Sequence, residues 1–328
     1  MQTITCCLVG YGGIAVFHTE ALKKIEGVRL HTVVGRRAQP AEAFRRKMGF
    51  EKATTRYEDA LDNPDVDAVV IASPSEHHHE QTAQALNAGK DVLVEIPLAM
   101  SHKGASELVG LARKTGRKVM VAHTRRFDPI SQFVKDFIAS GQAGQVHQHH
   151  SYTFSLRHQN IGWTGYRRSW VDDVVFHHGC HLVDYSLWSV GAPVRRIRGE
   201  LTPLHPKTGT SLDVSMLIRY KNEALATISL SYNAQQGASG NLFICENGTL
   251  IVSGNNVTLN GDTLFEDSGD LGDHVLAQNT EFIAAIRADR QPACSAEHGL
   301  AALTLLQQVY DQMITLEREA KYKRRWNL

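Results

Sequence analysis

The sequence predicts an α/β domain with a parallel sheet, followed by an α+β domain with an open antiparallel sheet. Short apolar runs alternate with helical segments over residues 1–122, a glycine-rich turn follows the first run, and strands come in close succession after about residue 143. At 328 residues and 42% apolar content, the chain can bury two cores. We place the domains at residues 1–122 and 123–328, with C-terminal helices that can pack back on the first domain.

Five apolar or β-branched runs mark the strands of the first domain. Segments rich in Ala, Leu, Lys and Glu separate them, and this alternation predicts a parallel sheet with right-handed crossovers. The runs are residues 3–9, 29–34, 68–73, 92–95 and 118–122.

The second domain begins with a helix and continues with strands. Residues 170–190 carry apolar residues at mixed three and four spacing, which predicts a helix. Tight turns such as Asn247-Gly248 separate the strands, as in an antiparallel sheet. The expected strands are residues 214–220, 224–232, 242–246 and 250–253, and a helical region, interrupted near Gln291-Pro292, covers residues 274–322.

The run His147-Gln148-His149-His150 fits a strand edge. Histidine is tolerated in such a position when it faces solvent. We expect this run to be exposed and assign it no role.

Charge and cysteine usage exclude several classes of protein. Thirty-five basic residues against 34 acidic ones give a net charge of +1, so no global field attracts nucleic acid or a membrane surface. The five cysteines are odd in number and lack C-x-x-C spacing, which argues against a disulfide framework. No apolar run or signal-peptide pattern indicates membrane insertion or export. We expect a cytoplasmic protein that acts on a small molecule.

A glycine-rich turn, Gly10-Tyr11-Gly12-Gly13-Ile14-Ala15, joins the first predicted strand to a helix. In the pattern G-x-G-x-x-A the first glycine permits a sharp turn, and the second lets the backbone approach a pyrophosphate. The small third residue lets helix and strand pack closely. Because the turn lies within a βαβ unit, it predicts a Rossmann-type dinucleotide site.

The position for a ribose-binding acid, about 20 residues further on, is Gly35, followed by Arg36 and Arg37. A carboxylate is absent there, whereas two guanidinium groups can pair with a phosphate. The sequence therefore favours NADP over NAD. The alternative is a solvated arginine pair at the start of a helix.

Several stretches, in this order and spacing, resemble the Gfo/Idh/MocA oxidoreductase family over nearly the whole chain. They are the turn at residues 10–15, Ser73-Pro74-Ser75-Glu76-His77-His78, residues 88–92, Glu95-Ile96-Pro97, His123-Thr124-Arg125-Arg126-Phe127 and residues 177–184. The resemblance implies a nicotinamide cofactor contacted by Ser73, Pro74, His78, Glu95 and Pro97. It also implies a homodimer or homotetramer.

Two positions depart from the family pattern. Ile96 stands where the family usually has a catalytic lysine, and His177 stands where it usually has an aspartate. One branch of the family is similar in both departures, in Arg168-Ser169-Trp170 and in residues 228–233. That branch uses NADP to oxidise a carboxylated cyclic hemiacetal, derived from protocatechuate, to 2-pyrone-4,6-dicarboxylate. The resemblance implies this reaction, or a closely related one, in the catabolism of aromatic compounds.

The run His177-His178-Gly179-Cys180-His181 is the expected acid/base segment. Residues four apart share one face of a helix, so His177 and His181 can reach one reacting centre. A histidine titrates near neutrality and can act as a base without lysine. We favour His181 as the base, with His177 orienting or relaying and His178 as a neighbour. Alternatively, some of these are hydrogen-bonded core histidines; a metal is not expected, because no third ligand has suitable spacing.

Arginines are the expected partners of the substrate carboxylates, because a guanidinium pairs with a carboxylate in bidentate geometry. Arg126 and Arg168 are favoured, since they lie in stretches that match the family. The other candidates are His123, Arg125, Arg157 and Arg167. A surface role is the alternative for each.

Two other functions remain open at this stage. One is oxidation of a sugar or cyclic polyol by the same fold, although Ile96 removes the lysine that normally supports that chemistry. The other is an NADP-binding sensor without catalysis, because a fold does not establish activity.

Overall fold

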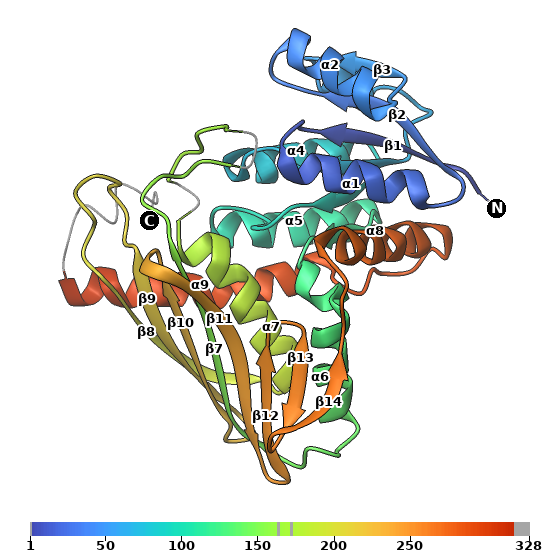
Figure 1. Ribbon diagram of the computed structural model, residues 1–328. Helices are drawn as coiled ribbons and strands as arrows, with labels where there is room; N and C mark the ends of the chain where they lie inside the picture. Colours follow the sequence, from blue (N-terminus) through green and yellow to red (C-terminus); the bar gives the residue numbers. More distant parts are fainter. Residues whose placement is uncertain (1, 163–164, 171–172, 318–328) are drawn as a thin grey trace. The chain divides into compact units, whose positions relative to one another are not determined.

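The structure is a computed structural model that describes residues 2–162, 165–170 and 173–317 (Figure 1). Contacts within the chain divide it into two compact units. The first comprises Met1–Phe127, Ile161–Arg168 and Gly269–Leu300, and the second comprises Asp128–Asn160, Ser169–Ser268 and Ala301–Leu328. Two later segments of the chain therefore join the first unit.

Six parallel strands form the sheet of the first unit, in the order β3-β2-β1-β4-β5-β6. From β1 to β3 each new strand is added on one side of the sheet, and from β4 to β6 each is added on the other side. The direction therefore switches between β1 and β4, and ligands bind at such a switch point in open α/β sheets. The strands are β1 (Ile4–Val9), β2 (Val28–Val34), β3 (Lys52–Thr54), β4 (Ala68–Ile71), β5 (Asp91–Val94) and β6 (Val119–Val121). All five expected strands are confirmed, and the short β3 is additional.

Helices complete the first unit. Every residue of β1, β4 and β5 is buried, which explains why these strands read as continuous apolar runs. The helical elements are α1 (Gly13–Lys24), α2 (Ala38–Met48), α3 (Glu58–Leu61), η1 (Ser75–His77), α4 (His78–Asn87), α5 (His102–Thr115), η2 (Thr124–Phe127) and α8 (Leu271–Arg287). Helix α8 lies beside α1 (Figure 1).

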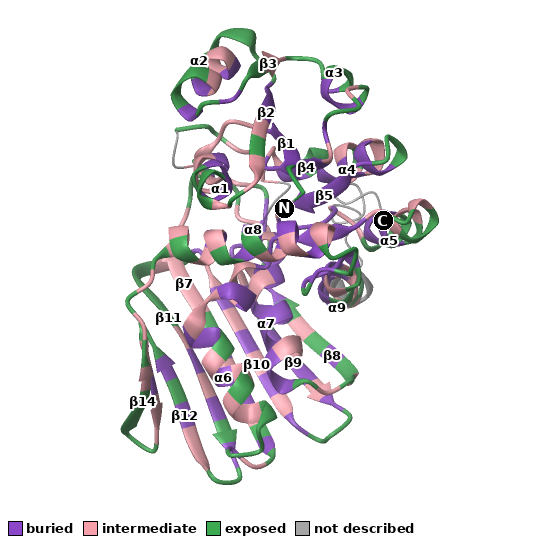
Figure 2. Ribbon diagram, turned by 90° about the vertical axis from the view of Figure 1, so that its right-hand side faces the viewer, coloured by how far each residue is buried: buried purple, intermediate pink, exposed green. Residues whose placement is uncertain are grey.

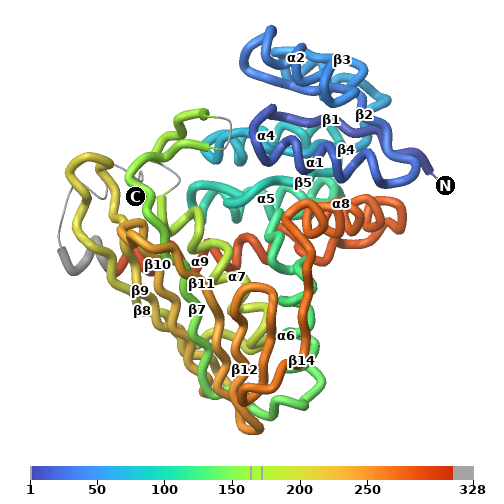
Figure 3. Tube along the Cα trace, in the orientation of Figure 1, coloured from blue at the N-terminus to red at the C-terminus, as the bar shows by residue number. Residues whose placement is uncertain are grey.

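The second unit is built on an eight-stranded sheet with the order β14-β13-β12-β11-β7-β10-β9-β8. All pairs are antiparallel except β7 with β10, which confirms the predicted open, largely antiparallel sheet. Its central strands run side by side in Figure 3. The strands are β7 (Val146–Leu156), β8 (Val194–Leu201), β9 (Asp213–Tyr220), β10 (Leu225–Ser231), β11 (Asn233–Cys245), β12 (Gly248–Ser253), β13 (Asn256–Leu259) and β14 (Asp262–Glu266).

Alternate residues along these strands face a core. In β9 every second residue is buried, and Figure 2 shows buried and exposed residues alternating along neighbouring strands. Facing pairs such as Tyr185 and Phe243 pack between the sheet and the helices. The helical elements of this unit are α6 (Pro129–Ala139), η3 (Val175–Gly179), α7 (Cys180–Val190) and α9 (Ala296–Glu317), of which α9 begins in the first unit.

The expected exposed strand edge at His147 to His150 is wrong. Strand β7 lies in the middle of the sheet, between β11 and β10, and His149 is 0% exposed. Its ring stacks on Phe243 at 4.1 Å between centroids, and its Nδ1 lies 2.9 Å from Ser186 Oγ. His147 is exposed as expected, because a register shift against β11 leaves it without a partner between the paired residues Val146 and Gln148, whereas His149 follows the regular pairing and faces the core. Hydrogen bonding and stacking make the buried position possible.

Both expected helical regions are found with shifted limits. Residues 171–172 and 318–322, which the predictions included, lie outside the described residues. The interruption near Gln291-Pro292 is confirmed, since α8 ends at Arg287 and α9 begins at Ala296. Within the described ranges, no helix has the length and apolar character needed to cross a membrane.

Candidate active site

The glycine turn has the geometry that a dinucleotide requires. Gly10 has a φ of +111°, and a Cβ there would lie 2.5 Å from the carbonyl oxygen of Ala72, so no other residue fits without strain. A Cβ on Gly12 would meet nothing within 4 Å, which leaves space beside the backbone. Gly12 also precedes α1 without a side-chain cap, so the first N–H groups of the helix are available to an anion. The turn therefore fits a pyrophosphate.

An aromatic ring occupies the place of the usual ribose-binding acid. A Cβ on Gly35 would lie 2.3 Å from Cε1 of Tyr11, so the ring covers this glycine. The next two residues, Arg36 and Arg37, are exposed, and neither forms an ion pair with another described residue. The end of β2 thus presents two guanidinium groups and no carboxylate at position 35.

A buried trio holds Glu95 at the end of β5. The amide nitrogen of Asn279 donates to the carbonyl oxygen of His18 (3.2 Å), which places the amide oxygen 3.0 Å from His18 Nδ1. An amide oxygen only accepts, so Nδ1 carries a proton. The other ring nitrogen, Nε2, lies 2.9 Å from Glu95 Oε1. One proton shared between these two atoms is enough for a hydrogen bond between the imidazole and the carboxyl group.

The trio combines a fully buried imidazole with a carboxyl that reaches the surface. The His18 side chain is 0% exposed and that of Glu95 is 14% exposed. Sequence reasoning assigned Glu95 to the cofactor but missed His18 and Asn279. A single imidazole on the buried face of α1, beside Ala15 and Leu22, was the available signal.

His78 joins two loops at the same edge of the parallel sheet. Its Nδ1 lies 2.8 Å from the carbonyl oxygen of Pro97, and its Nε2 lies 3.0 Å from that of Ser73. The ring is buried and contacts the loop after β4 through Ser73 and the loop after β5 through Pro97, so it holds these two loops together. A direct contact of His78 with cofactor stays a prediction.

The three candidate histidines do not lie on a regular α-helix. His177 and His178 belong to η3, a π-helical turn, and His181 lies in the first turn of α7. Gly179 N donates to Val174 O at 3.1 Å, which is i→i+5 spacing. The argument that residues four apart share a face assumed α-helical spacing and does not apply across this turn. The rings of His177 and His178 contact each other, with centroids 4.7 Å apart.

Tyr232 links a candidate arginine to a candidate histidine. The guanidinium carbon of Arg157 lies 5.4 Å from the ring centroid of Tyr232. The ring centroid of His178 also lies 5.4 Å from that of Tyr232. Asn160 accepts a hydrogen bond from Arg157 Nη2, and Trp170 contacts the Tyr232 ring at 6.3 Å. The second unit therefore gathers a cation, two imidazoles and two aromatic rings. Tyr232 and Asn160 were missed, although Tyr232 lies in a stretch that resembles the family.

The remaining candidate substrate residues lie in the first unit. His123 and Arg126 are buried in and beside η2, and Arg126 Nη1 is 3.5 Å from the carbonyl oxygen of Ala293. Arg125 is half-buried in the same element. Arg168 is half-buried beside Gly162, and Arg167 is exposed. Of the candidate arginines, only Arg157 shares a unit with the three histidines.

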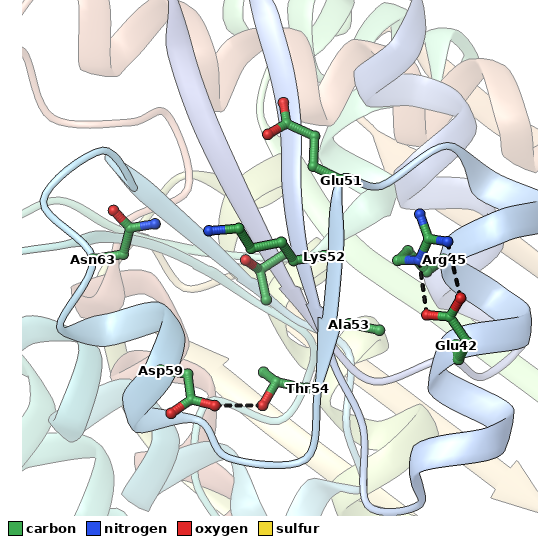
Figure 4. Close-up of a pocket in the computed structure, with 9 residues that line it drawn as sticks. Glu42, Arg45, Glu51, Lys52, Ala53, Thr54, Asp59 and Asn63 are labelled. Atoms are coloured by element: carbon green, nitrogen blue, oxygen red, sulfur yellow. Dashed lines mark hydrogen bonds and ion pairs between the residues drawn. The ribbon is translucent and has the colours of Figure 1, made fainter.

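The candidate residues coincide neither with a metal-binding cluster of described residues nor with the hollow beside β3. Among the described residues, no three His, Cys, Asp or Glu side chains are grouped to hold a metal ion. A hollow of about 420 Å³ beside β3 contains none of the predicted site residues. Its carboxylates have partners: Figure 4 shows Glu42 with Arg45 and Asp59 with Thr54, and Glu51 pairs with Arg29 outside the hollow. This hollow therefore presents mainly satisfied polar groups.

Comparison with known proteins identifies the family. The pattern of the oxidoreductase family with an NAD-binding Rossmann fold matches residues 4–123, and that of bacterial oxidoreductase C-terminal domains matches residues 129–268. Over 312 residues the chain is 34% identical to 4-carboxy-2-hydroxymuconate-6-semialdehyde dehydrogenase from Sphingobium sp. (strain NBRC 103272 / SYK-6), covering 93% of this chain and 98% of that protein. The chain belongs to the Gfo/Idh/MocA oxidoreductase family. It is an NAD(P)-dependent oxidoreductase.

Other proteins that are similar to this chain are named for different substrates. Myo-inositol 2-dehydrogenase from Thermotoga maritima is 24% identical over 314 residues, or 91% of this chain and 92% of that one. A structure of levoglucosan dehydrogenase with NADH and L-sorbose has a TM-score of 0.86 at 18% identity, over 96% of this chain and 98% of that one. At the position where the family usually has lysine, Ile96 is 5% exposed and supplies no titratable group.

Proposed function

We propose that this protein is an NADP-dependent dehydrogenase of the cyclic hemiacetal of 4-carboxy-2-hydroxymuconate-6-semialdehyde, or of a closely related carboxylated substrate. The product would be 2-pyrone-4,6-dicarboxylate, formed during catabolism of aromatic compounds. The observation that carries the proposal is the 34% identity, over nearly the full length of both chains, to a dehydrogenase named for that semialdehyde. The absence of lysine at Ile96 supports it, because the usual sugar-alcohol machinery of the family needs that amine.

The first unit supplies the cofactor site. The N–H groups at the start of α1 bind the pyrophosphate, and Arg36 and Arg37 pair with the 2′-phosphate of NADP. The resemblance assigns Ser73, Pro74, Glu95 and Pro97 to the nicotinamide end, where His78 and His18 fix the loops. The bound cofactor supplies the hydride acceptor.

The second unit supplies the proposed base. His181 would take the proton of the ring hydroxyl as the hydroxyl carbon is oxidised to the lactone carbonyl, while a bound nicotinamide would supply the acceptor for the hydride. His177 orients or relays that proton, and His178 is its ring neighbour. A neutral imidazole suits this step near neutral pH.

Arginines bind the substrate carboxylates in this proposal. Arg157 is held by Asn160 and by the face of Tyr232, so its guanidinium is oriented before a ligand arrives. Arg126 and Arg168 are the further candidates, with Arg125 and His123 beside them.

Cofactor reduction across a substrate panel tests the proposal. Purified protein is given NADP or NAD with the muconate semialdehyde hemiacetal, myo-inositol, scyllo-inositol, levoglucosan and several aldoses. We expect turnover with the hemiacetal and NADP at a kcat/KM at least 100-fold above that of any polyol, since unpaired arginines penalise a substrate without carboxylates. A higher kcat/KM with a polyol would replace the proposal by the second candidate.

Oxidation of a sugar or cyclic polyol is that second candidate. It is favoured by the match to myo-inositol 2-dehydrogenase, which covers 91% of this chain. Binding of NADP without turnover of any panel member would instead support a sensor.

A further inference from the structure

A buried carboxylate, Asp173, begins the segment that carries the three histidines. Its Oδ1 accepts hydrogen bonds from Val175 N at 3.0 Å and Phe176 N at 3.1 Å. These N–H groups belong to the first turn of a helical segment, where backbone donors lack preceding carbonyl partners, so the Asp173 side chain caps the turn from the residue before the backbone N-cap, Val174. At 1% exposure, it does so out of contact with solvent.

The second carboxylate oxygen is held by two distant parts of the chain. Thr210 Oγ1 donates to Oδ2 at 3.2 Å, and the hydroxyl of Tyr310 in α9 donates to the same oxygen. Both donors are buried, and the Tyr310 ring stacks on Phe176 with centroids 5.4 Å apart. A buried charge is tolerated only when it is fully hydrogen-bonded, and these four donors meet that requirement.

The capped segment is a π turn, which is rarer than an α turn and frequent at functional sites. The carbonyl oxygen of Asp173 accepts from His177 N at 2.9 Å, and Val174 O accepts from Gly179 N at 3.1 Å. The turn packs against neighbouring side chains, since a Cβ on Gly179 would meet Leu306 and Leu230 at the ordinary van der Waals distances of 3.4 and 3.5 Å. The turn therefore depends on its first hydrogen bonds and on close packing.

We propose that Asp173, together with Thr210 and Tyr310, is the positioning device for His177, His178 and His181 in the proposed reaction. This inference rests on the proposed function, but Asp173 itself contacts neither substrate nor cofactor. Without the cap, the segment can return to α-helical spacing, and a shift of one residue turns a side chain by about 100° around the helix axis. The histidines would then point away from their present neighbours.

Conservative variants test the device. Asp173→Asn replaces one carboxylate oxygen by an amide, and Tyr310→Phe removes one donor while leaving the cap. We expect kcat to fall about 100-fold in Asp173→Asn and about tenfold in Tyr310→Phe, because misplacing a reacting group by about 1 Å has effects of this size. KM for the substrate and the dissociation constant of NADP should change less than threefold. Ser189→Ala is the matched control, since Ser189 is also buried and, within the described part of the chain, its hydroxyl donates to Tyr185 O inside α7.

Histidine NMR separates this inference from the proposed function. In the cofactor-free protein, the ring ¹H–¹⁵N signals of His177, His178 and His181 should move in Asp173→Asn and Tyr310→Phe but not in Ser189→Ala. Unchanged signals and normal kcat in both folded variants would overturn the inference. If Asp173→Asn does not fold, Tyr310→Phe and Thr210→Val decide, because both retain the carboxylate and its backbone bonds. If wild-type protein turns over no hemiacetal, the proposed function fails while the NMR signals still test the positioning.

Discussion

At the scale of single residues, the proposed chemistry depends on imidazoles in place of the family's lysine. Ile96 is buried and apolar, so a proton leaving the substrate needs another acceptor. His181 is half-buried and lies where the family has its histidine.

Replacing His181 by Asn tests this role. Asparagine keeps a polar side chain of similar size but cannot take a proton, so we expect kcat to fall by about 10² to 10⁴. The dissociation constant of NADP, measured by fluorescence titration, should stay within twofold of wild type. Unchanged turnover would remove His181 from the mechanism.

The arginine pair after β2 determines which cofactor the protein prefers in our proposal. In Arg36→Ala/Arg37→Ala, a 2′-phosphate loses two charge-assisted partners, each contributing about 1.5–3 kcal/mol. KM for NADP should rise at least tenfold, while KM for NAD stays nearly constant. Exposed Arg195→Ala, in the second unit, is the control. Equal effects on both cofactors, or equal use of both by wild type, would contradict the assignment.

Sequence reasoning at this scale found candidates by type and could not find their partners. Gly10, Gly12 and Ala15 follow from a local pattern, because the turn needs those residues. Asn279 meets His18 from a helix about 260 residues later, and no local spacing indicates that contact.

At the scale of elements, the parallel sheet was predictable and the irregular parts were not. A strand buried on both faces needs a continuous apolar run, and β1, β4 and β5 have one. Strand β8 was missed because only Ile197 and Leu201 of its residues are buried and the rest are largely charged or polar. The π turn was missed because periodicity assumes α-helical spacing.

An ion pair between Glu281 of α8 and Arg290 makes the stability of the fold depend on pH. Hydrogen bonds from Arg290 (2.6 and 2.7 Å), with a further one from Ala293 N, hold the pKa of Glu281 below its usual value. A lowered carboxyl pKa stabilises the fold above the unfolded-state pKa of about 4.3, and this contribution is lost as pH falls through the folded-state pKa.

Unfolding of Glu281→Gln should reveal this dependence. In urea melts, the difference in unfolding free energy between wild type and the variant should be largest at neutral pH and shrink below about pH 4. The exposed Glu80→Gln serves as the control and should show little change with pH. A difference that is constant from pH 7 to pH 3.5 would show that Glu281 acts through packing alone.

At the scale of the whole molecule, the sheet of the second unit has one face with apolar groups in contact with solvent. Leu217 and Ile251 are 41% and 42% exposed, and strand pairing through β10, β7 and β11 places them on the same face. Exposed apolar residues on one face indicate an association surface. We therefore expect a homodimer or homotetramer, as the family resemblance also implies.

Light scattering after size exclusion tests this expectation. Wild type should have two or four times the mass of one chain, and Leu217→Arg/Ile251→Glu should move toward the monomer, because burial of two charges opposes association. Ser215→Asp alone, at a polar position of the same strand, should have a smaller effect. A monomeric wild type at 10 μM would contradict the expectation.

The ring of Tyr11 over Gly35 constrains how cofactor use can evolve. A Cβ at position 35 would lie 2.3 Å from Cε1 of Tyr11, so an aspartate there requires the Tyr11 ring to move or to be replaced by a smaller side chain. The residue at position 11 therefore determines the cost of introducing an acid at position 35, and the two positions are epistatic.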